Sequence, residues 1–189
     1  MFPKLESGYV DVTREVVSLT GMIEKNIETF RLLVQDKKIS LKATVDPALP
    51  SIHADPRRLD QVLNNLISNA IKFTGGGGQV EVGAALTDAT TVNVRVRDNG
   101  EGIPAEEIGQ IFEKYRQGGN VKHSSDKGTD LGLVIRKMII EAHGGCIWVE
   151  SESREGKYFL FIVAGQRPQS DQCYTGIRPC FFLGRSSFL

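Results

Sequence analysis

Two asparagines and a lysine recur along one stretch of the sequence at spacings that bring them together on a helix. At the helical rotation of about 100° per residue, Asn65, Asn69 and Lys72 fall within about 60° of one another. Amide oxygens are hard ligands that suit Mg²⁺, and a lysine ammonium neutralises phosphate charge. The three residues are therefore a candidate site for a magnesium-bound phosphate group, with a solvated helix edge as the alternative.

A carboxylate stands at the end of an alternating apolar segment. The valines at alternate positions from Val92 to Val96 share their parity with Asp98, so a strand would point all of them to one face. A buried carboxylate needs a donor, either within the protein or on a ligand such as the exocyclic amine of adenine. Gly100 and Gly102 would let the backbone approach a flat ligand closely. A tight turn with a capping aspartate is the alternative.

A third segment, from Gly128 to Leu133, is rich in glycine and opens a predicted helix. The free N–H groups and the positive dipole at such a helix start suit a phosphate group. The polar run over 116–129 has no apolar period and predicts a mobile loop that could close over a ligand. An aspartate-capped helix start explains the segment equally well.

The elements that must position these residues follow from apolar periodicity. Helices are expected over 18–38, from Pro56 to the glycines at 75–78, and over 131–142, with a short helix over 104–113. Alternation predicts strands over 10–17, 39–45, 79–86, 91–98, 146–151 and 158–163. Asp55 and Pro56 suit the cap and the first position of the second helix. The pattern predicts an α/β two-layer sandwich: a mixed, mostly antiparallel sheet with three main helices on one face.

The composition is that of a globular domain. The chain has 189 residues, with 23 Lys and Arg against 23 Asp and Glu, and this zero net charge argues against nucleic-acid binding by bulk electrostatics. Three cysteines without a Cys-x-x-Cys pair predict neither a disulfide framework nor a structural zinc site. Without a membrane-length apolar stretch or a signal-peptide core, we expect a cytoplasmic domain with no membrane contact of its own.

Taken in order, these segments resemble the catalytic, ATP-binding domain of bacterial sensor histidine kinases. Each box of that family is weak alone, but four boxes in the correct order and spacing are highly specific. The matching residues are Asn64-Asn65-Leu66 with Asn69-Ala70 and Lys72-Phe73-Thr74 (N box), Asp98-Asn99-Gly100-Glu101-Gly102 (G1 box), Ile111-Phe112-Glu113-Lys114 (F box), Gly128-Thr129 with Leu131-Gly132-Leu133 (G2 box), and His143-Gly144-Gly145.

The resemblance implies the Bergerat fold of this ATPase superfamily, with ATP between the N-box helix and the lid. It implies that Asn65 and Asn69 lie on the magnesium side, that Lys72 contacts phosphate, and that Asp98 accepts a hydrogen bond from the adenine amine. The other implied contacts are Gly100 and Gly102 beside the ring, Phe112 anchoring the lid, Gly128, Thr129, Leu131 and Gly132 at the phosphates, and Arg116 reaching the γ-phosphate.

The same resemblance implies partners outside the chain. The acceptor histidine of these kinases lies on a helical hairpin, and none of His53, His123 and His143 has the sequence context of an acceptor. We therefore expect residues 1–9 to be the stub of that hairpin, residues 10–163 to be the ATP-binding domain, and residues 164–189 to be a poorly ordered tail. The expected partners are the hairpin of the parent kinase and a response regulator downstream, and the chain itself is expected to be a monomer.

Three functions other than that of a histidine kinase stay as alternatives. Asp130 replaces the second G2-box glycine, and a carboxylate near a triphosphate is repulsive, so a degenerate nucleotide-binding or docking domain is one alternative. A standalone ATPase of the same fold is another, but the glutamate that activates water in such enzymes is Asn65 here, and an amide cannot take a proton at neutral pH. A serine kinase that acts on a regulatory partner shares the fold.

Overall fold

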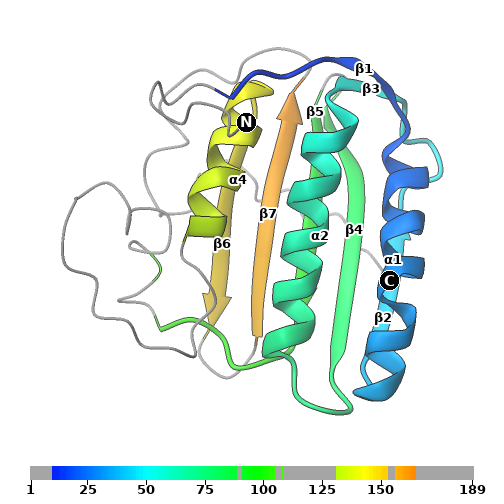
Figure 1. Ribbon diagram of the computed structural model, residues 1–189, viewed down its shortest axis with the longest axis vertical. Coiled ribbons are helices and arrows are strands. Elements are labelled where there is room, and N and C mark those ends of the chain that lie inside the picture. Colours follow the sequence, from blue (N-terminus) through cyan, green and yellow to red (C-terminus); the bar gives the residue numbers. More distant parts are fainter. Residues whose placement is uncertain (1–9, 89–90, 105–107, 109–130, 153–155, 165–189) are drawn as a thin grey trace, which may run out of the picture.

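The computed structural model describes residues 10–88, 91–104, 108, 131–152 and 156–164. Figure 1 shows two layers, with helices packed on one face of a sheet. The helices are α1 (Leu19–Asp36), α2 (Pro56–Phe73) and α4 (Leu131–Ala142). The strands are β1 (Glu15–Val17), β2 (Ser40–Val45), β3 (Ile52–Ala54), β4 (Gln79–Asp88), β5 (Thr91–Asp98), β6 (Cys146–Glu152) and β7 (Gly156–Ala164).

The main sheet has five strands in the order β2-β4-β5-β7-β6. β2 runs parallel to β4, whereas the other neighbouring strands are antiparallel. The two predicted hairpins are present as β4–β5 and β6–β7, and β7 also pairs with β5, which makes β5 the middle strand. The predicted two-layer sandwich with a mixed, mostly antiparallel sheet is confirmed.

The prediction of an edge strand over 10–17 was too long and placed the strand in the wrong sheet. Only Glu15–Val17 forms a strand, and it pairs with Ile52–Ala54 in a separate two-stranded sheet. The sequence before Asp55 offers only three strand residues, too few to show alternation, so this partner strand was not predicted. β7 runs to Ala164, the first residue of the predicted tail. Residues 1–9, predicted as the stub of a hairpin, and the rest of the predicted tail, 165–189, lie outside the described residues, and so does most of the short helix predicted over 104–113.

The long helices are held by caps at their N-termini and by one apolar face. Ser18 accepts a hydrogen bond from the Gly21 N–H at the start of α1, and Asp55 does the same for the N–H groups of Arg57 and Arg58 at the start of α2. The buried face of α2 packs on β4 and β5. Its seven members, each at most 1% exposed, are Leu59, Val62, Leu63, Leu66, Ile67, Ala70 and Ile71.

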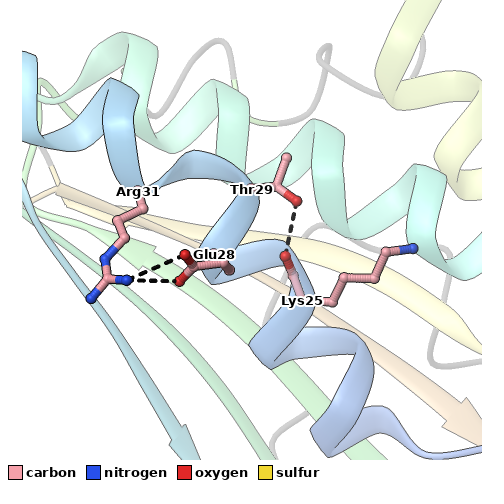
Figure 2. A network of polar contacts seen from close by, with 4 residues as sticks. All are labelled: Lys25, Glu28, Thr29 and Arg31. Atoms are coloured by element: carbon pink, nitrogen blue, oxygen red, sulfur yellow. Dashed lines mark hydrogen bonds and ion pairs between the residues drawn. The ribbon is translucent and has the colours of Figure 1, made fainter.

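α1 has a solvated face on the side away from its buried residues, among them Leu19, Ile23 and Val34. Figure 2 shows Arg31 contacting the carboxylate of Glu28 at 3.2 Å and the Thr29 hydroxyl donating to the Lys25 carbonyl at 2.9 Å. The side chains of Arg31 and Glu28 are 64% and 70% exposed. Such contacts within one helix stabilise it weakly and require no ligand. In the described part of the chain, no helix is long and apolar enough to cross a membrane.

Candidate nucleotide site

Three of the predicted site residues lie along one edge of the buried face of α2. Asn65 and Asn69 are half-buried, and Lys72, in the last turn, is exposed. The side-chain nitrogen of Asn65 donates to the carbonyl of Gln61 at 2.8 Å, which leaves its amide oxygen on the opposite side of the group. The Nζ of Lys72 lies 5.4 Å from the centre of the Phe73 ring. The edge therefore offers amide groups and one solvated cation.

Asp98 ends the middle strand of the sheet. It is opposite Val80 of β4 and Lys157 of β7, and it is only 1% exposed. Its Oδ1 accepts a hydrogen bond from the Gly100 N–H at 3.0 Å. Val92, Val94 and Val96 on the same face are also buried, so the predicted inward aim of this carboxylate is confirmed.

Gly100 is explained by a contact within the protein. A Cβ atom on Gly100 would collide with the backbone carbonyl oxygen of Phe73, the last residue of α2. The absence of a side chain therefore lets the end of β5 close directly against the end of α2. Gly102 has φ +31°, in the left-handed region that favours glycine. Both glycines shape the loop that brings Asp98 beside α2.

The loop after β5 is bound at two further points. Asn99 accepts from the Gln79 N–H through its side chain at 2.7 Å and donates its own N–H to the Gln79 carbonyl at 3.2 Å. The Ile103 N–H donates to the Ser151 hydroxyl of β6 at 2.6 Å. The loop over 99–103 is thus tied to both β4 and β6, which gives Asp98 a fixed surrounding.

α4 carries a residue that the sequence analysis missed. Arg136 is 5% exposed, and the end of its guanidinium folds back towards Gly132 in the first turn, so that a Cβ on Gly132 would lie 2.6 Å from its Nη2. Burial lowers the pKa of Arg136 to about 10. Its positions relative to Ile139, Ile140 and His143 put it on the buried face of α4. In the sequence, the signal that could have revealed Arg136 is a cationic residue at a position where the helical period predicts a buried apolar one.

Several predicted site residues lie outside the described residues. These are Phe112, Arg116, Gly128 and Thr129, and for Leu131 only the backbone is described. Asp130, the departure from the G2 box, also lies outside them. The described structure thus places the G1-box loop against the end of the N-box helix α2, and α4 packs beside α2. The placement of the F box and of the predicted lid stays a prediction.

The donor set near α2 suits a metal ion that arrives with a ligand. Within the described ranges, no group of three or more His, Cys, Asp or Glu side chains could hold a metal ion. Asn65 and Asn69 offer amide oxygens, and Mg²⁺ usually keeps several waters and binds few protein ligands beside substrate phosphates. The amide oxygens of Asn65 and Asn69 therefore fit a Mg²⁺ ion that is also bound by phosphates.

Comparison with protein families decides which class of site this is. Residues 54–166 match the family described as histidine kinase-, DNA gyrase B-, and HSP90-like ATPase, and this range contains α2, β5 and α4. The chain belongs to this family. The match covers every element of the candidate nucleotide site, so the buried Asp98 and the start of α4 lie within an ATPase domain.

Within the family, similar relatives include sensor kinases. The adaptive-response sensory kinase SasA of Parasynechococcus marenigrum is 39% identical over 130 residues, which are 67% of this chain and 33% of that protein. The sensor histidine kinase RcsC of Escherichia coli is 36% identical over 98% of this chain and 21% of that protein. The matched part of this chain therefore spans about a third of the length of SasA and about a fifth of the length of RcsC.

Solved structures agree with the sequence matches. The nucleotide-free catalytic domain of histidine kinase ThkA is 30% identical, with a TM-score of 0.70 over 83% of this chain and 97% of that domain. Full-length ShkA in complex with AMPPNP, also 30% identical, gives a TM-score of 0.71 over 82% of this chain and 31% of that protein. In sequence and in fold, the chain matches histidine kinase catalytic domains.

Proposed function

We propose that this chain binds ATP and acts as the catalytic domain of a sensor histidine kinase, transferring the γ-phosphate to a histidine that lies outside the chain. The observation that carries the proposal is Asp98, a buried carboxylate at the end of the middle strand, closed against the end of α2 through Gly100. A buried carboxylate in a fixed loop selects a ligand with an N–H donor, and the amine of adenine meets that requirement. Membership of the ATPase family supports the choice of adenine.

The other residues of the candidate site are assigned to the phosphate end of the ligand. Lys72 would neutralise phosphate charge, and the start of α4 at Gly132 would present backbone N–H groups. Asn65 and Asn69 would hold Mg²⁺ together with the phosphates, and the ion would offset their negative charge. Phe112, Arg116, Gly128 and Thr129 are proposed for the same site from the sequence alone.

The proposed reaction needs no general base from this chain. A nitrogen lone pair of the neutral acceptor imidazole attacks the γ-phosphorus, and the bond from that phosphorus to the β,γ-bridging oxygen breaks. ADP leaves with the bond's electron pair, and the imidazole releases its proton to solvent. Catalysis then consists of positioning and of charge stabilisation. Asn65 fits this scheme better than water activation, because its amide cannot accept a proton at neutral pH.

The partners follow from the relatives. We propose that the acceptor histidine belongs to a helical hairpin of the parent kinase and that a response regulator receives the phosphoryl group afterwards. Histidine kinase ThkA, 30% identical to this chain, has been solved in complex with its response regulator TrrA. The sensor kinases that the chain resembles support a kinase over a degenerate docking domain.

Calorimetric titration with a non-hydrolysable ATP analogue, with and without Mg²⁺, tests the binding step. We expect saturable binding that Mg²⁺ strengthens and that Asp98→Asn weakens by about tenfold, since a charge-assisted hydrogen bond is lost. Asp88→Asn is the control, because this exposed carboxylate lies at the far end of the hairpin. A folded chain that does not bind at millimolar ligand contradicts the proposal.

Radiolabelled ATP tests the transfer step. The chain is mixed with the separately produced hairpin of the parent kinase, and the label is expected on the hairpin as an acid-labile phosphoramidate. A hairpin whose acceptor histidine is replaced by glutamine should stay unlabelled. Release of free phosphate without labelled hairpin would favour a standalone ATPase instead.

A further inference from the structure

We propose that Arg136 is an additional phosphate-binding residue of this domain, acting from the second turn of α4 on an anion at the first turn. The inference rests on the proposed nucleotide site and adds a residue to it. It starts from the burial of Arg136, which is only 5% exposed, although arginine is rarely buried without a partner.

Within the part of the chain that the structure describes, the guanidinium of Arg136 is only partly satisfied. Its Nε is buried and has no hydrogen-bond partner among the residues that the structure describes. Removing a guanidinium from water costs free energy unless an anion or acceptors replace the water. The lowered pKa, about 10, reflects that burial and agrees with the geometry. Arg136 therefore has unused capacity to bind an anion.

The direction of the side chain shows where that anion would lie. The guanidinium is folded back along α4, so that both terminal nitrogens and Cζ would lie within about 3 Å of a Cβ on Gly132. Gly132 is in the first turn of α4, where the helix dipole is positive. A cation at this end is repelled by the helix, whereas an anion there is attracted by both the N–H groups and the guanidinium.

The absence of a side chain at Gly132 makes room for the guanidinium of Arg136. A side chain at position 132 would occupy the space that the guanidinium now takes, since the would-be Cβ lies 2.6 Å from Nη2 and 2.8 Å from Nη1. The glycine thus admits the arginine to the helix start. A phosphate group has the charge and the several acceptor oxygens that a guanidinium and backbone N–H groups can share.

Binding of adenosine, ADP and the ATP analogue to Arg136→Met is the test. We expect ADP and the ATP analogue to bind about 10- to 100-fold more weakly, with adenosine unchanged, because only the phosphates meet the guanidinium. Arg136→Lys should recover part of the loss. Lys137→Met is the control: it removes the same charge from the same helix, at a side chain that is 28% exposed.

A thermal melt without nucleotide separates this role from a structural one. Removing an unsatisfied buried charge should leave the melting temperature of Arg136→Met equal to that of the wild type or higher, whereas the rise caused by ADP should shrink. An equal loss of affinity for adenosine and ADP, or an unchanged affinity for ADP, overturns the inference. If Asp130→Ala restores ADP affinity to Arg136→Met, the arginine only neutralises Asp130, and direct phosphate binding is excluded.

The outcomes distinguish this inference from the proposed function. If the wild-type chain binds neither ADP nor the ATP analogue, the proposed function fails and the inference fails with it. If the wild type binds and Asp98→Asn weakens binding while Arg136→Met does not, only the inference is wrong.

Discussion

The ring of His143 is hydrogen-bonded to the backbone of Asp55, which lies 88 residues earlier in the chain: its Nε2 accepts the Asp55 N–H at 2.9 Å. Its Nδ1 lies 2.8 Å from the Ile139 carbonyl, which can only accept, so the proton is on Nδ1 and the ring is neutral. Asp55 caps α2, and His143 follows the end of α4. The contact therefore joins the start of α2 to the end of α4. Both helices contribute residues to the proposed nucleotide site.

Residues Thr13 and Arg14, before β1, are hydrogen-bonded to the same part of the structure. The Thr13 N–H donates to Oδ2 of Asp55 at 2.9 Å, and Arg14 donates to the Ala142 carbonyl at 3.3 Å. We call Thr13, Arg14, Asp55, Ala142 and His143 the Asp55 junction. It joins the beginning of the described chain to the start of α2 and the end of α4.

Acid should weaken the Asp55 junction through His143. Burial lowers the pKa of His143, the hydrogen bond to Ile139 and the charge of Asp55 raise it, the charge of Arg14 lowers it, and the net shift is downwards from 6.5. Because the unfolded ring takes up a proton at a higher pH than the folded ring does, the stability contributed by His143 is complete above about pH 6.5 and falls as the pH decreases towards the folded pKa.

Urea unfolding at a series of pH values measures this effect. The free energy of unfolding is expected to fall between about pH 7.5 and 5.5, and His143→Gln should be less stable at high pH but show a flatter dependence. His53→Gln is the control, since His53 is an exposed histidine on β3. A slope that His143→Gln leaves unchanged would show that another group titrates.

Loss of the Asp55 carboxylate should destabilise the domain more than loss of the other N-cap. Asp55→Ala removes hydrogen bonds from Thr13, Arg57 and Arg58, and we expect a loss of about 2 kcal/mol. Ser18→Ala removes one bond, from the Gly21 N–H, and we expect about 1 kcal/mol or less. Denaturant unfolding of both variants measures the difference, and equal losses would mean that the two additional hydrogen bonds of Asp55 contribute nothing.

Asp55 should also contribute to unfolding at strongly acid pH. Burial raises the pKa of Asp55, but the hydrogen bonds from Thr13, Arg58 and Arg57 and the charge of His143 together lower it below 3.8. The stability from this carboxylate is therefore present above about pH 3.8 and is lost as the pH falls through the folded pKa. Asp55→Asn should remove this part of the acid transition and leave the part due to His143.

Gly100→Ala should damage both the fold and nucleotide binding. Its methyl group would collide with the Phe73 carbonyl, which is backbone and cannot rotate away, so the end of β5 must separate from the end of α2. We expect about 1–3 kcal/mol of lost stability and at least tenfold weaker binding of the ATP analogue. Gly75→Ala is the matched control, since nothing lies within 4 Å of its would-be Cβ. Equal effects at the two glycines would contradict this account.

The ion pair on the outer face of α1 should contribute little. Glu28→Gln breaks the contact with Arg31, but both side chains are more than 60% exposed, and we expect a change within about 0.5 kcal/mol. Nucleotide affinity should be unchanged, because the pair lies on the solvated face of α1 (Figure 2). Denaturant unfolding in low and high salt is the measurement, and a large effect would show that this face has a partner.

Much of the fold followed from local patterns. The helix over 131–142 and the hairpin of 79–86 with 91–98 were predicted within two residues of their observed ends, because long amphipathic helices and alternating strands carry their period in the sequence. The separate sheet of β1 and β3 was missed. Each strand has three residues, and their pairing depends on a contact between distant segments that no local pattern reveals.

The sequence by itself determined the helical and strand faces, the inward aim of Asp98 and the order of the family's boxes, because spacing along one element fixes which side chains share a face. The tertiary structure alone decided that Gly100 meets the Phe73 carbonyl, that His143 accepts from Asp55, and that Arg136 is buried over Gly132. These contacts depend on how separate elements approach one another, or on a side-chain direction that packing selects, and residue spacing does not specify either.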